Sequence, residues 1–242
     1  MGLFTTTKQP FTTLIRNKTK KQLARVEHTQ PIAEFCALII MALRNQTLKE
    51  EIYNTLSHGA GVLFCVIAVP ILIFYALEKS NMATVYSVSI FGFGMFMVYL
   101  SSTLFHAIQH DGAKRKFQVL DHISIYLLIA GSYTPLVVKF LHKDTATLFL
   151  SVMWGIVLLG SILKIFFTGR FAVASTILYL VLGWMAVFII KPFFNNVPLD
   201  VFLWLLGGGL LYTGGVYFYM KEHKPYHHAI WHLFVLGGTI TH

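Results

Sequence analysis

The sequence has few charged residues and almost no cysteine. Only 12% of its 242 residues are charged, whereas soluble domains carry about 25%. This deficit, with a hydrophobic content of 56%, indicates a chain surrounded largely by lipid. The two cysteines, Cys36 and Cys65, cannot form a disulfide framework, and no Cys-x-x-Cys spacing exists for a zinc finger or redox site. We therefore expect both thiols to be unpaired.

Long runs without charged residues divide the chain into seven candidate membrane spans. A helix rises about 1.5 Å per residue and needs roughly 20 apolar residues to cross a bilayer. The runs are continuously apolar and do not alternate, which favours helices over barrel strands. The predicted fold is all-α, a polytopic membrane protein with a seven-transmembrane helix bundle. The expected spans are 57–77, 82–108, 122–138, 145–163, 171–190, 201–220 and 225–242.

Basic residues are distributed unequally between the two ends of these spans. Fifteen Lys or Arg lie before the first span or in loops on the same side, and four lie on the other side. The positive-inside rule therefore predicts a cytoplasmic N-terminus and a C-terminus outside. We attribute the net charge of +9 to this topology and to contact with anionic lipid headgroups, and not to nucleic acid.

The first 46 residues differ from the rest of the chain. Residues 1–46 are predicted to be a basic segment, partly disordered or with an interfacial helix over 35–43, and residues 47–242 to be the transmembrane domain. Met41 is an alternative start of translation, and no secretory signal is evident. Thr47 and Glu50 have the spacing of a capping box, which predicts a short helix just before the first span.

Five polar residues gather at the predicted cytoplasmic face. His106 ends the second span, Asp121 opens the third, and His228 and His232 begin the seventh. Ser102 lies four residues before His106 and so shares its helical face. A charged group at the centre of a membrane helix costs roughly 2.5–3.5 kcal/mol, so such groups are kept where they serve packing or chemistry. The topology places all five residues at comparable depth.

Three imidazoles in this arrangement suit a zinc ion. A His-x-x-x-His pair on one helix supplies two ligands, His228 and His232, and His106 on another helix supplies the third. Three protein ligands leave the fourth position open for water, as in catalytic zinc sites. Asp121 is then expected to orient or deprotonate this water, and Ser102 to hydrogen-bond the water, Asp121 or a developing oxyanion.

Each residue also has a simpler interpretation. Two histidines four apart occur by chance in a chain with 11 histidines. Ser102 could bond a backbone carbonyl, and Asp121 could cap the N-terminus of a helix. Glycines at 207–209, 214–215 and 237–238 are expected to let membrane helices approach closely.

The remaining histidines are weaker candidates for the site. His58 and His122 are candidates for contacting the metal ligands without binding the metal, and for His58 a polar helix end is an equally good interpretation. We expect His227 to face away from the ligand pair and His242 to lie on the opposite side of the membrane. The histidines expected in solvent are His28, His110, His142 and His223.

Five short motifs together resemble the haemolysin III family. This family is the bacterial branch of the progestin and adipoQ receptor superfamily, which includes the adiponectin receptors. The resemblance covers roughly residues 50 to 242. The motifs are Ser-His-Gly-Ala-Gly at 57–61, Ser-Ser-Thr-Leu-Phe-His at 101–106, Leu-Asp-His at 120–122, Ile-Ala-Gly-Ser-Tyr-Thr-Pro at 129–135 and His-Ala-Ile-Trp-His-Leu-Phe at 228–234.

The resemblance implies seven helices around a zinc ion held by His106, His228 and His232, with Asp121 and Ser102 nearby. Because the receptors and the related alkaline ceramidases are linked to hydrolysis of the ceramide amide bond, we expect a zinc-dependent hydrolase of lipid amides or esters. It would act in membrane lipid homeostasis at a bacterial inner (plasma) membrane. The alternatives are a non-enzymatic regulator or receptor with structural zinc and, third, a pore-forming cytolysin.

Overall fold

The computed structural model describes residues 46–242, and this part of the chain is helical throughout, without a strand. The predicted all-α class is therefore confirmed for these residues. The predicted interfacial helix over 35–43 and His28 lie outside them. The elements are α2 (Leu48–Lys79), α3 (Met82–Ala107), α4 (Asp111–Phe140), α5 (Lys143–Phe167), α6 (Ala172–Gly183), the 3-10 helix η1 (Met185–Ile189), α7 (Ile190–Asn196), α8 (Leu199–Tyr219) and α9 (His227–Thr241).

Six helical segments in the described chain are long and apolar enough to cross a membrane. They are α2, α3, α4, α5, α8 and the segment Ala172–Asn196, which comprises α6, η1 and α7. Helix α9 has 15 residues, a length of about 22 Å against a hydrocarbon core of about 30 Å. Six of the seven expected spans thus have the required length, and the seventh span and the orientation of the bundle stay predictions.

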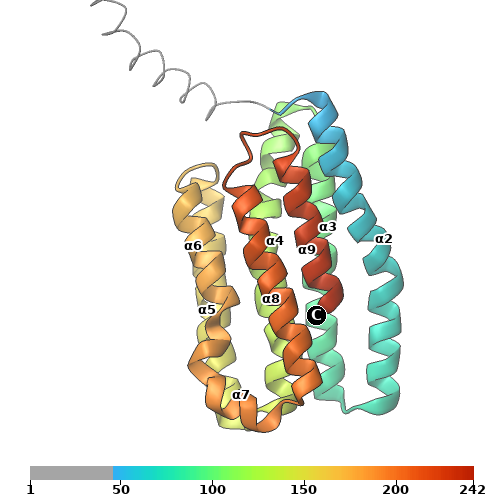
Figure 1. Cartoon of the computed structure of the whole chain (residues 1–242), viewed down its shortest axis with the longest axis vertical. Helices are drawn as coiled ribbons and strands as arrows, with labels where there is room; N and C mark the ends of the chain where they lie inside the picture. Colours follow the sequence, from blue (N-terminus) through green and yellow to red (C-terminus); the bar gives the residue numbers. More distant parts are fainter. Residues whose placement is uncertain (1–45) are drawn as a thin grey trace, which may run out of the picture. The chain divides into compact units, whose positions relative to one another are not determined.

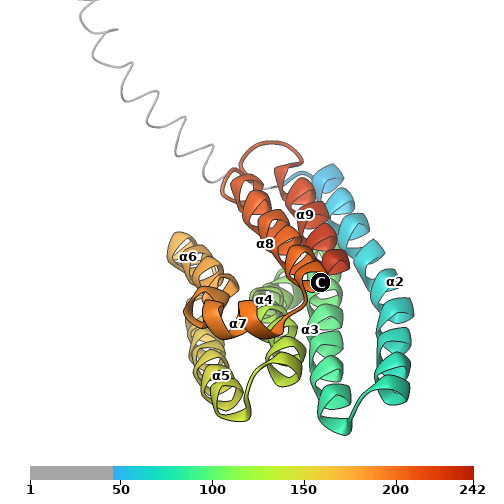
Figure 2. The ribbon, with the colours of Figure 1, turned by 60° about the horizontal axis from the view of Figure 1, so that its bottom comes forward.

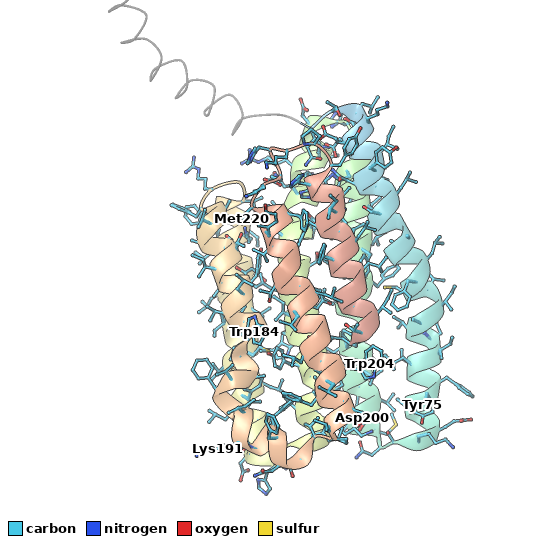
Figure 3. All side chains as sticks on the ribbon, in the orientation of Figure 1. Tyr75, Trp184, Lys191, Asp200, Trp204 and Met220 are labelled. Carbon is cyan, nitrogen blue, oxygen red and sulfur yellow. The ribbon has the colours of Figure 1, made fainter. Side chains whose placement is uncertain are left out.

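The outer surface of the bundle is apolar. Large hydrophobic side chains are exposed along the spanning helices, and Phe166 and Phe188 are 72% and 81% exposed. Figure 3 shows side chains projecting outward along the bundle between Lys191 and Asp200 near one end and Met220 near the other. A surface of this kind would drive association in water and is satisfied by lipid. Together with the six long apolar helices, it indicates a membrane protein.

The helices pack around α4. Helix α4 contacts α3 on one side and α5 and α6 on the other, and α2 packs on α3. Helices α8 and α9 pack together, and α9 also contacts α2 (Figures 1 and 2). As a result, the start of α2, the end of α3 and the start of α9 lie at the same end of the bundle (Figure 1).

Helix α2 begins at the predicted capping box. The Thr47 side chain accepts a hydrogen bond from the Glu50 backbone, and the Glu50 carboxylate accepts one from the Thr47 backbone at 2.8 Å. The prediction of a separate short helix was wrong, because α2 continues for 32 residues through the first span. The residues between this cap and residue 57 are good helix formers, and none of them breaks the helix. The helix that begins at the cap therefore continues into the first span.

Helix α4 starts earlier than the hydrophobic pattern indicated. It begins at Asp111, where the His110 side chain accepts a hydrogen bond from the backbone N–H of Ala113. The residues expected to form a loop before the third span therefore form the first turns of α4, because charged residues with good helix propensity do not end a helix. Asp121 lies inside α4. The alternative that Asp121 caps a helix was therefore wrong, and its place at the start of the third membrane span stays a prediction.

The expected span over 171–190 is interrupted. Helix α6 ends at Gly183 and a 3-10 helix follows. The hydroxyl of Tyr133 on α4 donates to the carbonyl oxygen of Gly183 at 2.6 Å and accepts from the backbone N–H of Ala186 at 3.1 Å. In a bilayer, backbone groups freed by a helix break need such partners. Tyr133 of the Ile-Ala-Gly-Ser-Tyr-Thr-Pro motif therefore stabilises this break.

Two glycines allow close packing below the polar end of the bundle. A Cβ at Gly61 on α2 would overlap the ring of Tyr99, which is fully buried and donates a hydrogen bond to the Thr239 hydroxyl on α9 at 2.7 Å. A Cβ at Gly215 on α8 would lie 2.6 Å from the Trp231 ring on α9. The expected role of glycine in helix approach is thus confirmed at Gly215, and Tyr99 joins α2, α3 and α9.

Candidate metal centre

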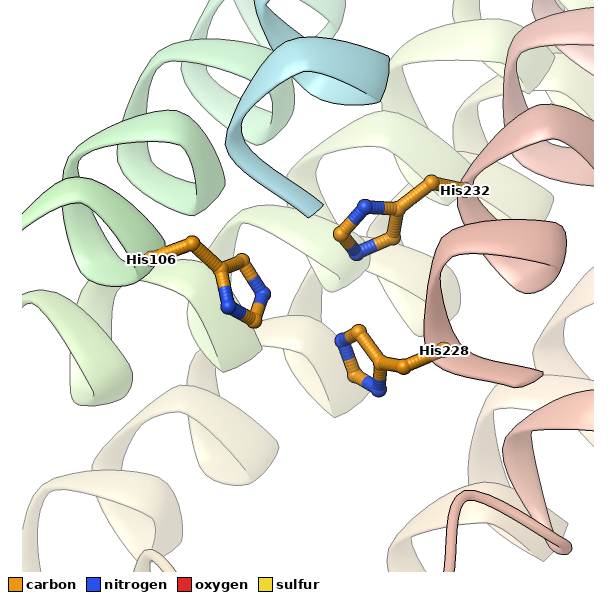
Figure 4. A group of neighbouring side chains, drawn as sticks. All are labelled: His106, His228 and His232. Atoms are coloured by element: carbon orange, nitrogen blue, oxygen red, sulfur yellow. The ribbon is translucent and has the colours of Figure 1, made fainter. Parts of the chain in front are cut away.

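Three histidines from two helices converge at the polar end of the bundle. His106 is the penultimate residue of α3, and His228 and His232 lie in the first two turns of α9. One ligand atom from each lies within 4.8 Å of the others, so the group could hold a metal ion. Figure 4 shows the His106 ring facing the other two rings. His106 and His232 are buried, and His228 is 13% exposed.

Each of these histidines uses Nδ1 for a hydrogen bond to the protein. His106 Nδ1 lies 2.6 Å from Glu51 Oε2, and His228 Nδ1 lies 3.0 Å from Glu222 Oε2. His232 Nδ1 lies 3.2 Å from the carbonyl oxygen of Asn54. Carboxylate and carbonyl oxygens only accept, so Nδ1 is the donor in all three pairs.

This hydrogen-bond pattern leaves the three Nε2 atoms for a ligand. A neutral imidazole that donates through Nδ1 has an acceptor lone pair on Nε2. His106 Nε2 is buried and has no hydrogen-bond partner within residues 46–242, which is costly unless something binds there. Three neutral imidazole nitrogens suit zinc and also copper, iron and nickel. The donor set therefore fits a transition metal.

The carboxylate at the rim of the site is affected by its histidine partner. Partial burial raises the pKa of Glu222, but its hydrogen bond with His228 lowers it, and the resulting pKa is below the ordinary value. Glu222 is therefore a carboxylate at neutral pH, as an acceptor for His228 Nδ1 must be.

Asp121 and Ser102 lie beside the histidines. Asp121 on α4 is buried and interacts electrostatically with Ser102, His228 and Lys164. Ser102 lies one turn before His106 on α3, and its hydroxyl is buried close to the Asp121 carboxylate. Four helices thus contribute to this region: α2, α3, α4 and α9.

His58 belongs to the same region. It is buried on α2, and its ring stacks on that of His232 with centroids 3.5 Å apart. Both of its ring nitrogens lack a hydrogen-bond partner among the described residues. His58 therefore packs directly behind a candidate ligand, which fits the predicted neighbouring role better than that of a polar helix end.

The other histidines lie outside the group of three. His122 is partly buried beside Asp121, and its Nδ1 has no hydrogen-bond partner. His227 Nδ1 contacts the carbonyl oxygen of Pro225, and His242 Nε2 contacts that of Leu205 on α8. The described histidines at exposed positions are His110, His142 and His223.

Four residues that contact the histidines were not predicted from the sequence. Glu51, Asn54 and Ser57 lie on α2, and Glu222 lies in the turn before α9. Glu51, Asn54 and His58 follow one another at intervals of three and four residues, which places them on one helical face. This polar helical face at the start of an apolar span is the sequence feature from which these contacts could have been predicted.

Comparison with known proteins agrees with the motifs. The family model described as Haemolysin-III related matches residues 46–242. The chain is 42% identical over 199 residues to Hemolysin-3 of Bacillus cereus, and the match covers 82% of this chain and 91% of the relative. It is also 42% identical over 193 residues to the Hemolysin-3 homolog of Bacillus subtilis (strain 168), with 80% and 91% covered.

A more distant relative extends the similarity beyond bacteria. The chain is 28% identical over 162 residues to the Monocyte to macrophage differentiation factor of Homo sapiens, covering 63% of this chain and 66% of the relative. This similarity supports the wider superfamily that the motifs indicated.

Proposed function

The chain belongs to the Haemolysin-III related family of membrane proteins, and we propose that it is a zinc-dependent hydrolase of lipid amides or esters. The observation that supports this most directly is the set of three histidines with Nδ1 bound to the protein and Nε2 left for a metal. A three-ligand site is the arrangement of catalytic zinc, in which the fourth position takes water or substrate.

The proposed chemistry divides among a few side chains. A bound zinc ion would lower the pKa of a coordinated water to about 7. Asp121, buried and close enough to interact with His228, accepts a proton as general base. The Ser102 hydroxyl, which is buried close to Asp121, donates a hydrogen bond to the oxygen that becomes negative during attack.

The depth of the site suggests the substrate class. His106 is the penultimate residue of α3 and His228 the second residue of α9, so the ligands lie at helix ends within the polar end of the bundle. The amide or ester linkage of a lipid lies at the same level, between its headgroup and its acyl chains. A lipid entering from the bilayer would bring this linkage to the histidines without leaving the membrane.

The cellular setting is proposed from the relatives and the charge distribution. We propose the inner (plasma) membrane of a bacterium, because two relatives at 42% identity are bacterial. We propose that the histidines lie on the cytoplasmic side, because the basic residues concentrate at the ends of the helices near them. Membrane lipids, including anionic headgroups, are the proposed partners.

Lipid hydrolysis by the purified protein tests the proposal. The full chain would be reconstituted with zinc, and release of fatty acid from N-acyl and O-acyl lipids would be measured. Asp121→Asn is expected to lower the rate by about 10²–10⁴-fold. Asp111→Asn removes the same charge from the exposed first turn of α4 and should leave the rate unchanged.

Two results would decide against a hydrolase. One is full zinc occupancy without release of fatty acid from any lipid class. The other is equal activity of the Asp121→Asn variant and the unaltered protein.

A regulator or receptor with structural zinc is the second candidate. It is favoured by the bonds that already tie the helices together here, from α2 to α3 through Glu51 and from α2 to α9 through Asn54 and Ser57. A metal that braces helices fits such a network. In that case Asp121→Asn would leave metal content and cellular function unaltered while loss of His106 would abolish both.

The names of two relatives, Hemolysin-3 and Hemolysin-3 homolog, raise a third candidate, a pore-forming cytolysin. Apolar spanning helices suit a resident membrane protein better than a toxin that inserts from water. Lysis of red cells by chain released in soluble form would favour the cytolysin.

A further inference from the structure

The first three turns of α2 contact candidate ligands of both α3 and α9. Glu51 accepts a hydrogen bond from His106 Nδ1 at 2.6 Å. The Asn54 carbonyl oxygen, one turn later, and the Ser57 hydroxyl, about one further turn along the helix, lie 3.2 and 2.9 Å from His232 Nδ1. A helix that supplies none of the three candidate ligands therefore contacts two of them.

The Glu51 carboxylate is held in place from its other side. Its Oε1 accepts a hydrogen bond from Lys114 Nζ at 2.7 Å. The same ammonium group donates to the carbonyl oxygens of Phe105 and Ile108 at the end of α3, at 3.2 and 3.4 Å. Lys114 on α4 thus links Glu51 to the turn that carries His106 and limits the freedom of the carboxylate to turn toward water.

The pairing of Glu51 with His106 has a direct consequence for metal binding. A carboxylate that accepts from one ring nitrogen fixes the tautomer and orientation of the ring and makes the other nitrogen a stronger ligand. His106 Nε2, the other nitrogen of this ring, is buried and has no hydrogen-bond partner in the part of the chain that the structure describes. We infer that Glu51 is a positioning residue, which holds the His106 ring so that Nε2 faces the metal.

The two carboxylate partners of the site differ in exposure. The side chain of Glu51 is 13% exposed and that of Glu222 is 51% exposed. Water competes for the Nδ1–H of His228 far more than for that of His106, and a charge-assisted hydrogen bond weakens as solvent reaches it. Glu51 should therefore influence metal affinity more than Glu222 does.

Zinc affinity measured on the full chain tests this role. The inference rests on the metal site of the proposed function, but it needs no hydrolysis. The dissociation constant would be obtained by competition with a fluorescent chelator, and the absorption bands of bound Co²⁺ would report the ligand geometry. Glu51→Gln is expected to weaken zinc binding about 10–100-fold and to shift the Co²⁺ bands.

Two further variants separate positioning from general structural effects. Glu78→Gln makes the same change at the exposed far end of α2 and should leave affinity unchanged. Lys114→Gln removes the ion pair with Glu51 and the hydrogen bonds to α3, but it keeps the Glu51 carboxylate as the acceptor for His106. It should therefore lower the thermal stability of the bundle more than it lowers the affinity for zinc. If Glu51→Gln does not fold, Glu51→Asp keeps the charge, moves the acceptor away from Nδ1 and should weaken binding to an intermediate degree.

The outcomes distinguish this inference from the proposed function. Weaker zinc binding by Glu51→Gln supports the positioning role even where no lipid is hydrolysed. Equal affinity of Glu51→Gln and the unaltered chain overturns the positioning role and leaves the hydrolase proposal standing. A chain that binds no zinc overturns both.

Discussion

A bound metal ion is expected to stabilise the folded bundle, because its candidate ligands lie on α3 and α9. His106 is separated from His228 by more than half of the described chain, so the three ligands meet only in the folded state. An ion that binds the folded state alone stabilises it by RT ln(1 + [L]/Kd), which is about 2.7 kcal/mol at a free zinc concentration of roughly 100 times Kd.

This free energy converts into a measurable shift. For a domain of this size, about 1 kcal/mol changes Tm by roughly 2–4 °C, so about 2.7 kcal/mol corresponds to roughly 5–11 °C. Tm would be followed by intrinsic tryptophan fluorescence in detergent, with zinc and after treatment with a chelator. His228 and His232 are only four residues apart, so the unfolded chain can retain some zinc binding at this pair. Such binding would place the shift in Tm at the lower end of this range.

A matched pair of variants ties the shift to the site. His228→Ala removes a ligand whose side chain is partly exposed, so the packing of the bundle is least disturbed. His227→Ala removes the neighbouring histidine, whose Nδ1 contacts Pro225 and not the group of three. Zinc should stabilise the unaltered chain and the His227 variant alike, and the His228 variant much less. A full shift in His228→Ala, or a zinc-loaded chain whose Tm does not change on removal of zinc, would refute the reasoning.

Three other predictions follow from particular contacts. Tyr133→Phe removes both hydrogen bonds at the break after Gly183 and should destabilise the bundle by about 1–3 kcal/mol, measured by thermal denaturation in detergent. Glu222→Gln should weaken zinc binding by less than about 10-fold, because the carboxylate is half exposed. In a chain without its native cysteines, the Asp144→Cys variant should react with a membrane-impermeant maleimide on intact cells. The Arg170→Cys variant should react only after the cells are permeabilised.

Each of these predictions has a control and a contradicting result. Tyr75→Phe alters an exposed tyrosine and should leave Tm unchanged. If Tyr75→Phe and Tyr133→Phe lowered Tm equally, Tyr133 would have no particular role in stabilising the break after Gly183. A larger loss of affinity in Glu222→Gln than in Glu51→Gln would contradict the argument from exposure. Labelling at Arg170 but not at Asp144 on intact cells would reverse the predicted orientation.

The sequence alone was enough to predict the helices and the three histidines. Long runs without charge identify six helices that the structure bears out, because backbone groups in lipid must bond within their own segment. The capping box at Thr47 and the pair His228 and His232 were equally predictable, since both depend on the period of a single helix.

Helix boundaries were less predictable. Hydrophobicity marks where the apolar run begins, which is not where the helix begins. Helix α4 therefore starts at Asp111, and Asp121 lies inside it. The break after Gly183 was missed because its stabilising partner, Tyr133, comes from another helix.

The sequence by itself determined which segments are long and apolar enough to cross a membrane and which side chains could bind a metal, because these properties depend on residue type and local spacing. Only the tertiary structure decided which groups accept from each Nδ1: Glu51 for His106, Glu222 for His228 and Asn54 for His232. Two of these pairs join residues more than 50 positions apart. Such pairing is a result of helix packing, and no local period in the chain encodes it.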